Sequence, residues 1–133
     1  MLRIPQTIVD ALLAHARAGY PLETCGILGG VDDAVSEFYP MANVDQSREH
    51  FRMEPKEQFA VAKDLRAKGK VIVAVYHSHP DTPARPSEED IRLALTPNVS
   101  HAILSLAGAE PVLKAFRIAA GISTPDPIEI RPA

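Results

Sequence analysis

Two histidines at the end of an apolar run are the residues of this sequence that are best suited to metal chemistry. His77 and His79 follow residues 71–76, a run that is short enough for a buried strand and too short to cross a membrane. Because side chains alternate along a strand, both imidazoles are predicted to point the same way, with Ser78 on the opposite face. Two imidazoles on one rigid element form a pair of metal ligands, and Pro80 ends the strand directly after them.

The segment that follows this strand supplies a carboxylate. Ser87-Glu88-Glu89-Asp90 opens a stretch with helical apolar spacing, which is typical of a helix N-terminus with Ser87 as the cap and acidic side chains in the first turn. Asp90, one turn into this helix, is also suited to be a third metal ligand. Two neutral imidazoles and one carboxylate leave a fourth tetrahedral position for water, as in catalytic rather than structural zinc sites. Both interpretations can hold for the same residues.

The two segments together resemble the JAMM motif, HxHP followed by SxxD, of the JAB1/MPN/Mov34 metalloprotease family. Here the motif reads HSHP, then six residues, then SEED. That family also uses a glutamate near the N-terminus, ahead of a glycine-rich apolar strand, and residues 23–29, ETCGILG, are similar to that segment. The resemblance continues through Asn43 and residues 51–53 and covers roughly residues 5–120. The short length is similar to that of the stand-alone prokaryotic members.

The resemblance implies both a fold and a site. The fold is α/β: a single layered domain over residues 1–133 in which a mixed β-sheet is flanked by helices, as in JAMM/MPN and cytidine-deaminase-like proteins. One Zn²⁺ per chain is implied, with the ligands His77, His79 and Asp90. Glu23 is implied as the base that activates water, because a carboxylate must take the proton and pass it to the leaving amine. Ser87 is implied as the group that stabilises the oxyanion.

The implied activity is hydrolysis of the amide bond after the C-terminal Gly-Gly of a small ubiquitin-like or sulfur-carrier protein. The amine released is either a lysine of a conjugated protein or free cysteine, and the sequence does not choose between them. The main alternative is a non-catalytic MPN scaffold or binding module of a larger assembly, although such scaffolds have lost ligands that this chain retains. A zinc deaminase is excluded, because its H-x-E and P-C-x-x-C motifs need more than the single cysteine present. RadC-type proteins share HxHP and SxxD, but their motif typically reads HNHPSG where this chain has HSHPDT.

Cys25 is the residue whose place relative to the metal the sequence leaves open. A thiolate is a good zinc ligand, and on one regular strand Cys25 and Glu23 would share a face. A bend at Glu23 or a bulge at Gly26 would separate the two side chains. We expect a buried and inert Cys25, since free cysteine packs as a small apolar residue.

Residues 42–54 are polar and mixed, with Phe51 and Met53 alternating as in a short strand. In the family that the sequence resembles, this region flanks the catalytic groove. Phe51 and Met53 are therefore candidate substrate-binding residues, which would hold an extended substrate tail by strand addition. The alternative is a solvated loop with two side chains anchored in the core.

The remaining pattern predicts the elements that position these residues. Helices are predicted at 5–18 and 55–68, and in the second of these Phe59, Ala62 and Leu65 are expected to pack on the sheet. Further strands are predicted at about 23–31, 35–41, 100–107 and 112–119. The tail from residue 120 is expected either to add one short edge strand at 128–130 or to stay loose.

Composition limits the classes of partner and compartment. A length of 133 residues suits one hydrophobic core, and a formal net charge of −3 gives no basic footprint for nucleic acid. One cysteine rules out an internal disulfide and fits a reducing compartment. We see no signal peptide and no apolar run of membrane length, so a cytoplasmic protein without a membrane partner is expected. The oligomeric state is not indicated.

Overall fold

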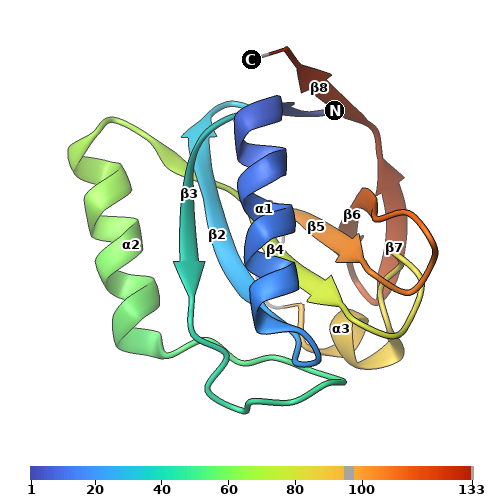
Figure 1. The fold of residues 1–133 in the computed structure, drawn as a ribbon. Coiled ribbons are helices and arrows are strands. Elements are labelled where there is room, and N and C mark those ends of the chain that lie inside the picture. The colour runs from blue at the N-terminus through green and yellow to red at the C-terminus, as the bar shows by residue number, and fades with distance from the viewer. Residues whose placement is uncertain (95–97, 133) are drawn as a thin grey trace.

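The computed structural model describes residues 1–94 and 98–132. Figure 1 shows the described elements along the chain: β1 (Leu2–Pro5), α1 (Gln6–Gly19), β2 (Cys25–Val31), β3 (Ala34–Met41), α2 (Pro55–Ala67), β4 (Val71–His79), α3 (Glu88–Arg92), β5 (Ser100–Ser105), β6 (Val112–Ala119), β7 (Ile122–Asp126) and β8 (Ile128–Arg131). The predicted α/β class with a mixed sheet and flanking helices is confirmed.

The strands of the described chain form one eight-stranded sheet in the order β7-β6-β5-β4-β2-β3-β1-β8. The sheet is mixed, because β4 pairs parallel with β5 and β1 pairs parallel with both β3 and β8, whereas the other pairs are antiparallel. β7 and β8 lie at the two edges of this order, although only Pro127 separates them in the chain. The sheet therefore has to curve until its edges approach each other, and it curves around α1 (Figure 1).

Helices pack on both faces of the sheet, and the alternation along each strand decides which helix a side chain faces. The α1 face holds a cluster of buried residues from α1 and the central strands, which includes Leu12, Ala16, Leu28, Ala74 and Tyr76. The opposite face holds a second cluster, from α2 and its neighbours, which includes Cys25, Ile27, Met53, Val61 and Leu65. On β4, Ser78 follows the alternation of Tyr76, so Ser78 faces α1 while His77 and His79 face the other side.

Helix α2 contacts the sheet through Val61 and Leu65. The expectation that Phe59, Ala62 and Leu65 pack on the sheet is wrong for Phe59, which is 73% exposed. Val61 and Leu65 are four residues apart and so lie on one helix face, which is the face that meets the sheet. Gly29 permits this close approach, because a Cβ at that position would lie 2.3 Å from a methyl carbon of Leu65.

Both ends of the chain contribute more strand than the sequence predicts. β1 precedes the first helix, and its Leu2 and Ile4 are completely buried. In a stretch of four residues, the apolar–polar alternation of a strand cannot be distinguished from the first turn of a helix. The sequence therefore does not predict this strand. The tail forms two strands, β7 and β8, instead of a single short one. β2 begins only at Cys25, so Glu23 lies in the preceding loop.

The two ends of the chain and the short helix α3 lie at opposite ends of the sheet (Figure 1). β4 is a central strand with β2 on one side and β5 on the other, and its last residues lie near α3. None of the helices in the described ranges combines the length and the apolar character that crossing a membrane requires.

Candidate metal centre

The two histidines of the HSHP segment occupy the C-terminal end of β4. Both side chains are almost completely buried, with exposed fractions of 2% for His77 and 3% for His79. Ser78 between them points to the α1 face, where its hydroxyl accepts a hydrogen bond from Thr24 Oγ1 at 3.0 Å. The predicted alternation of the three side chains is confirmed, and it brings two imidazoles to one side of a rigid strand.

Asp90 reaches the histidines from the first turn of α3. Ser87 Oγ accepts a hydrogen bond from the Asp90 backbone N–H at 3.0 Å, and Asp90 Oδ2 accepts one from the Ser87 N–H at 2.9 Å. These two bonds form a reciprocal cap, so the predicted helix N-cap is confirmed. The cap also holds the Asp90 carboxylate in one orientation, because turning it away would break the bond from the Ser87 N–H.

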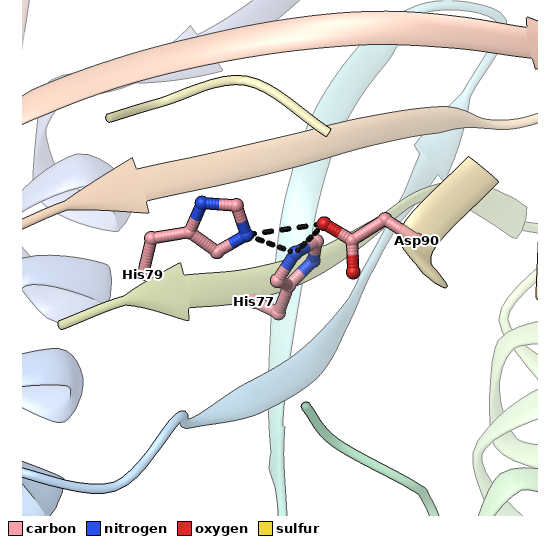
Figure 2. A group of neighbouring side chains, drawn as sticks. All are labelled: His77, His79 and Asp90. Carbon is pink, nitrogen blue, oxygen red and sulfur yellow. Dashed lines mark hydrogen bonds and ion pairs between the residues drawn. The ribbon is translucent and has the colours of Figure 1, made fainter. Parts of the chain in front are cut away.

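Three donor atoms converge on one point between β4 and α3, as Figure 2 shows. Nε2 of His77 and Nε2 of His79 are 3.1 Å apart. Oδ2 of Asp90 lies 3.2 Å from the first of these nitrogens and 3.1 Å from the second. Zinc bonds of about 2.0–2.1 Å place neighbouring tetrahedral ligands about 3.3–3.4 Å apart, so the observed triangle is close to the size that a zinc ion requires.

A further contact orients each ring. Nδ1 of His79 lies 2.9 Å from the carbonyl oxygen of Pro83. A carbonyl only accepts, so Nδ1 carries the proton and Nε2 presents a lone pair to the centre. The His77 ring stacks on Phe51 with the ring centroids 4.6 Å apart, and its Nδ1 is buried without a hydrogen-bond partner in the described ranges. The donor set is therefore two imidazole nitrogens and one carboxylate oxygen aimed at a single point, which fits zinc.

Burial and mutual contact shift the pKa values of the three groups. Burial lowers the pKa of His77. Burial alone would also lower the pKa of His79, but the hydrogen bonds of the protonated ring to Asp90 and to the Pro83 carbonyl, together with the charges of Asp90 and Glu23, outweigh burial and raise the pKa. Burial acts to raise the pKa of Asp90, whereas its hydrogen bonds with both imidazoles bring it well below the usual range. Asp90 is therefore ionised at neutral pH and supplies the negative charge that a cation needs.

Glu23 lies beside this centre with its carboxyl group buried. Its exposed fraction is 4%, and Oε1 has no hydrogen-bond partner among the residues that the structure describes. Burial raises the pKa of Glu23 to about 8, with nearby His79 lowering it and nearby Asp90 raising it. A carboxyl group whose pKa is close to neutral is suited to take up a proton and to return it.

The backbone of Glu23 and Thr24 is fixed from two sides, although both residues precede β2. Glu23 N–H donates to the Ser47 carbonyl at 2.8 Å, and the Glu23 carbonyl accepts from Asn43 Nδ2 at 3.1 Å. Thr24 N–H donates to Ser78 Oγ at 2.8 Å, and the Thr24 carbonyl accepts from Ser78 N–H at 2.9 Å. The position of Glu23 thus depends on the 42–54 loop and on the strand that carries the histidines.

A cleft of about 340 Å³ adjoins the histidines and extends toward α2. Its lining includes Phe51, Met53, Val75, His77, Asp90, Leu93 and His101. Residues 42–54 form a loop, so the expected strand-like alternation of Phe51 and Met53 is wrong. Both side chains nevertheless line the cleft, and Met53 is buried. A larger hollow of about 640 Å³ lies along β6 and the β7–β8 connection, with residues 83–85 also in its lining, and neither His77 nor His79 lines it.

His101 is a residue of this cleft that sequence reasoning did not single out. Its side chain is buried, with an exposed fraction of 9%. Its Nε2 has no hydrogen-bond partner in the described chain. Parallel pairing of β5 with β4 aligns His101 with Val75, which places it on the same face as His77. The sequence does not show which residues of β4 and β5 pair, so it does not predict that His101 lies on the same face as His77.

Cys25 lies next to the histidine strand but is not part of the donor triangle. It pairs in register with His77, and its Sγ donates weak hydrogen bonds to the carbonyls of Met41 (3.8 Å) and Ala42 (3.6 Å). Burial raises the pKa of the Cys25 thiol to about 12, so the group is a neutral thiol at physiological pH. The structure thus places it as the buried, inert cysteine that was expected.

Replacing Cys25 by serine is expected to leave the zinc content and the hydrolytic rate nearly unchanged. The hydroxyl can donate to the same two carbonyls, and no ligand of the triangle is altered. Metal analysis of the purified variant checks this, with Cys25→Ala as the companion that has no donor atom. A loss of zinc in both variants would make Cys25 a metal ligand.

The curved mixed sheet and the three converging donors define a small α/β protein with a candidate metal site at the end of its central strand. A family model described as prokaryotic homologs of the JAB domain matches residues 5–119. The chain belongs to this family, and the predicted resemblance to JAB1/MPN/Mov34 proteins is confirmed.

Individual relatives and structures agree with this family. The chain is similar to the CysO-cysteine peptidase of Mycobacterium tuberculosis, with 33% identity over 133 residues that cover 98% of this chain and 91% of that protein. It is similar to the desampylase of Haloferax volcanii, with 34% identity over 106 residues, 74% of this chain and 76% of that protein. A solution structure of a protein from Desulfitobacterium hafniense superposes with a TM-score of 0.92 at 43% identity, covering 100% of this chain and 94% of that one.

Proposed function

We propose that this protein is a zinc-dependent peptidase or isopeptidase. Its substrate would be a small ubiquitin-like or sulfur-carrier protein, and the bond cleaved would be the amide after the C-terminal Gly-Gly. The observation that supports this most directly is the triangle of His77, His79 and Asp90 with the buried carboxyl group of Glu23 beside it. The Mycobacterium and Haloferax relatives, a CysO-cysteine peptidase and a desampylase, support the substrate class.

The proposed reaction assigns a task to each group. Zinc held by His77, His79 and Asp90 would supply a Lewis acid and lower the pKa of bound water to about 7. Glu23 takes the proton of the attacking water and returns it to the amine that leaves. Its buried position and raised pKa suit both transfers.

Ser87 is proposed to stabilise the oxyanion. Its Oγ already accepts a hydrogen bond from the Asp90 N–H, and a hydroxyl can accept and donate at the same time. The hydroxyl proton is therefore free to be donated to the carbonyl oxygen of the scissile bond as negative charge develops there. Such a donor typically contributes about 3 kcal/mol to lowering the barrier.

The surroundings of His77 favour a substrate tail without side chains. The Phe51 ring lies on His77 with a centroid distance of 4.6 Å, and Met53 lines the same cleft. A peptide that reaches the donor triangle along this cleft must pass beside the aromatic ring, where a glycine backbone needs the least space. This supports a Gly-Gly terminus, with Phe51 and Met53 as its contacts. The leaving amine is proposed to be a lysine side chain or free cysteine.

The test is a panel of small Gly-Gly-terminated carrier proteins, each fused at its C-terminus to a peptide or to cysteine. We expect the zinc-loaded enzyme to cleave at least one fusion directly after the second glycine, with release detected by mass spectrometry. A chelator should stop cleavage, and added zinc should restore it. The matched control is the same fusion with Ala-Ala in place of Gly-Gly, which should be cut far more slowly. If zinc-loaded protein cuts none of the fusions, the peptidase proposal fails and a scaffold role takes its place.

A further inference from the structure

Asn43 joins the 42–54 loop to Glu23 through its side chain, in addition to the backbone bond from Glu23 N–H to the Ser47 carbonyl. Its side-chain amide nitrogen donates to the Glu23 carbonyl at 3.1 Å and to the His50 carbonyl at 3.0 Å. Its amide oxygen accepts from the backbone N–H of Asp45 at 3.2 Å and from that of Arg52 at 3.1 Å. An asparagine side chain has two donor hydrogens and two acceptor positions, so Asn43 uses its full hydrogen-bonding capacity. A flipped amide would oppose two carbonyls with oxygen, so this orientation alone satisfies all four partners.

The partners of Asn43 lie at both ends of the loop as well as at Glu23. Asp45 belongs to the start of the loop, whereas His50 and Arg52 belong to its end and line the cleft. The ends are also joined directly, because Val44 N–H donates to the Arg52 carbonyl at 3.0 Å. One side chain therefore links the conformation of the cleft-lining segment to the position of the Glu23 backbone.

We propose that Asn43 is a positioning residue that couples the 42–54 loop to Glu23, so that the loop conformation which lines the cleft is also the one that holds the carboxyl group in place for reaction. The claim that Asn43 holds Glu23 in place for reaction rests on the proposed function. The claim that Asn43 couples the loop to Glu23 rests on the hydrogen bonds alone. Asn43 is neither a member of the donor triangle nor a lining residue of the cleft, and it acts through the backbone of Glu23.

The sharpest variant is Asn43→Asp, which keeps the size and the acceptor side of the amide. Its carboxylate still accepts from Asp45 and Arg52, but it replaces the amino group that faces the Glu23 and His50 carbonyls by oxygen. We expect kcat to fall at least about 10-fold, because misplacing a catalytic group by about 1 Å can cost 100-fold. Zinc content should stay at the wild-type level, and KM should change less than kcat. The matched control is Val44→Ala, the neighbouring exposed loop residue, which should leave kcat, KM and zinc unchanged.

A double-variant cycle decides whether Asn43 acts through Glu23. With Glu23→Gln as the background, measured at enzyme excess, Asn43→Asp should cause no further loss of rate, because the group it positions no longer transfers protons. An equal fold-loss in both backgrounds, or an effect on KM alone, would overturn the proposal. Asn43→Ala, which removes the amide without adding charge, is measured in the same cycle. If Asn43→Asp folds poorly, the Asn43→Ala result tests the proposal in its place.

Hydrogen exchange tests the structural part without any substrate. In zinc-loaded Asn43→Asp or Asn43→Ala, exchange should accelerate both in the segment 44–52 and at the Glu23 amide, whereas Val44→Ala should leave both protected. Faster exchange of the loop with an unchanged Glu23 amide would overturn the coupling. If wild-type protein cleaves no fusion in the panel, the proposed function fails, and the exchange result still decides whether Asn43 joins the loop to Glu23.

Discussion

Replacing Glu23 by glutamine is expected to leave zinc bound at one ion per chain and to slow hydrolysis by about 10²–10⁴-fold, the usual contribution of a positioned general acid and base. Glutamine has nearly the same shape, so the packing around the buried side chain is kept. It cannot take up a proton, so the transfer from water to the leaving amine has no carrier. The measurement is kcat on a cleaved Gly-Gly fusion, together with metal analysis of the same preparation.

The control for this variant is an exposed carboxylate of the neighbouring loop. Glu49→Gln removes one negative charge near the site without touching a buried group and should keep the wild-type rate. A Glu23→Gln enzyme that cleaves at the wild-type rate would show that another group moves the proton. Glu89 would then be the first group to examine, because it lines the cleft and is one of the charges that influence the pKa of Glu23.

The His77→Ala, His79→Ala double variant is expected to contain no zinc and to have no measurable hydrolysis. The two substitutions remove both nitrogen donors of the triangle and leave a single carboxylate, which does not hold zinc against water and buffer. Atomic absorption or mass spectrometry of the purified protein checks the metal, and the fusion assay checks the activity. Full zinc content in this variant would refute the ligand assignment.

The control for this double variant is a histidine on the other face of the sheet. It shows whether zinc is lost because ligands were removed or because any histidine was replaced. His15 of α1 lies against Phe38 and Tyr76, with ring centroids 5.6 and 6.0 Å away. His15→Asn should therefore keep its zinc. Circular dichroism melting curves of all variants show whether any loss of metal follows from unfolding.

The parts of the site that are local in sequence were predictable. The HSHP segment fixes two donors by strand alternation alone, and the cap at Ser87 places Asp90 one turn into a helix. Both features depend on residues a few positions apart, so periodicity and capping rules suffice to predict them. The same holds for the α/β class, since strands and helices alternate clearly along most of the chain.

The parts that depend on pairing between distant segments were not predictable. His101 joins the cleft only because β5 pairs in parallel with β4 in one particular register. Phe59 has the spacing of a core residue but is exposed, whereas Val61 meets the sheet beside the correctly predicted Leu65. A pattern of apolar residues on a helix allows more than one face, and only the shape of the partner surface selects between them.

The place of Glu23 illustrates the same limit. No local signal distinguishes it from the other glutamates, and only the family resemblance selected it. In the structure its position depends on Asn43 and Ser47 from one segment and on Ser78 from another, which contact Glu23 or the adjacent Thr24. These partners are far apart in sequence, so local sequence rules do not predict that they meet.

The separation of the chain ends from α3 has a practical consequence for experiments on intact substrates. β1 and β8, the strands next to the two ends, lie at the far end of the sheet from α3, the helix that carries Asp90 (Figure 1). A fluorescent reporter or an affinity handle attached at either end would stand clear of the cleft mouth. Binding of a bulky carrier can therefore be followed on immobilised or labelled protein without the label competing for the same space.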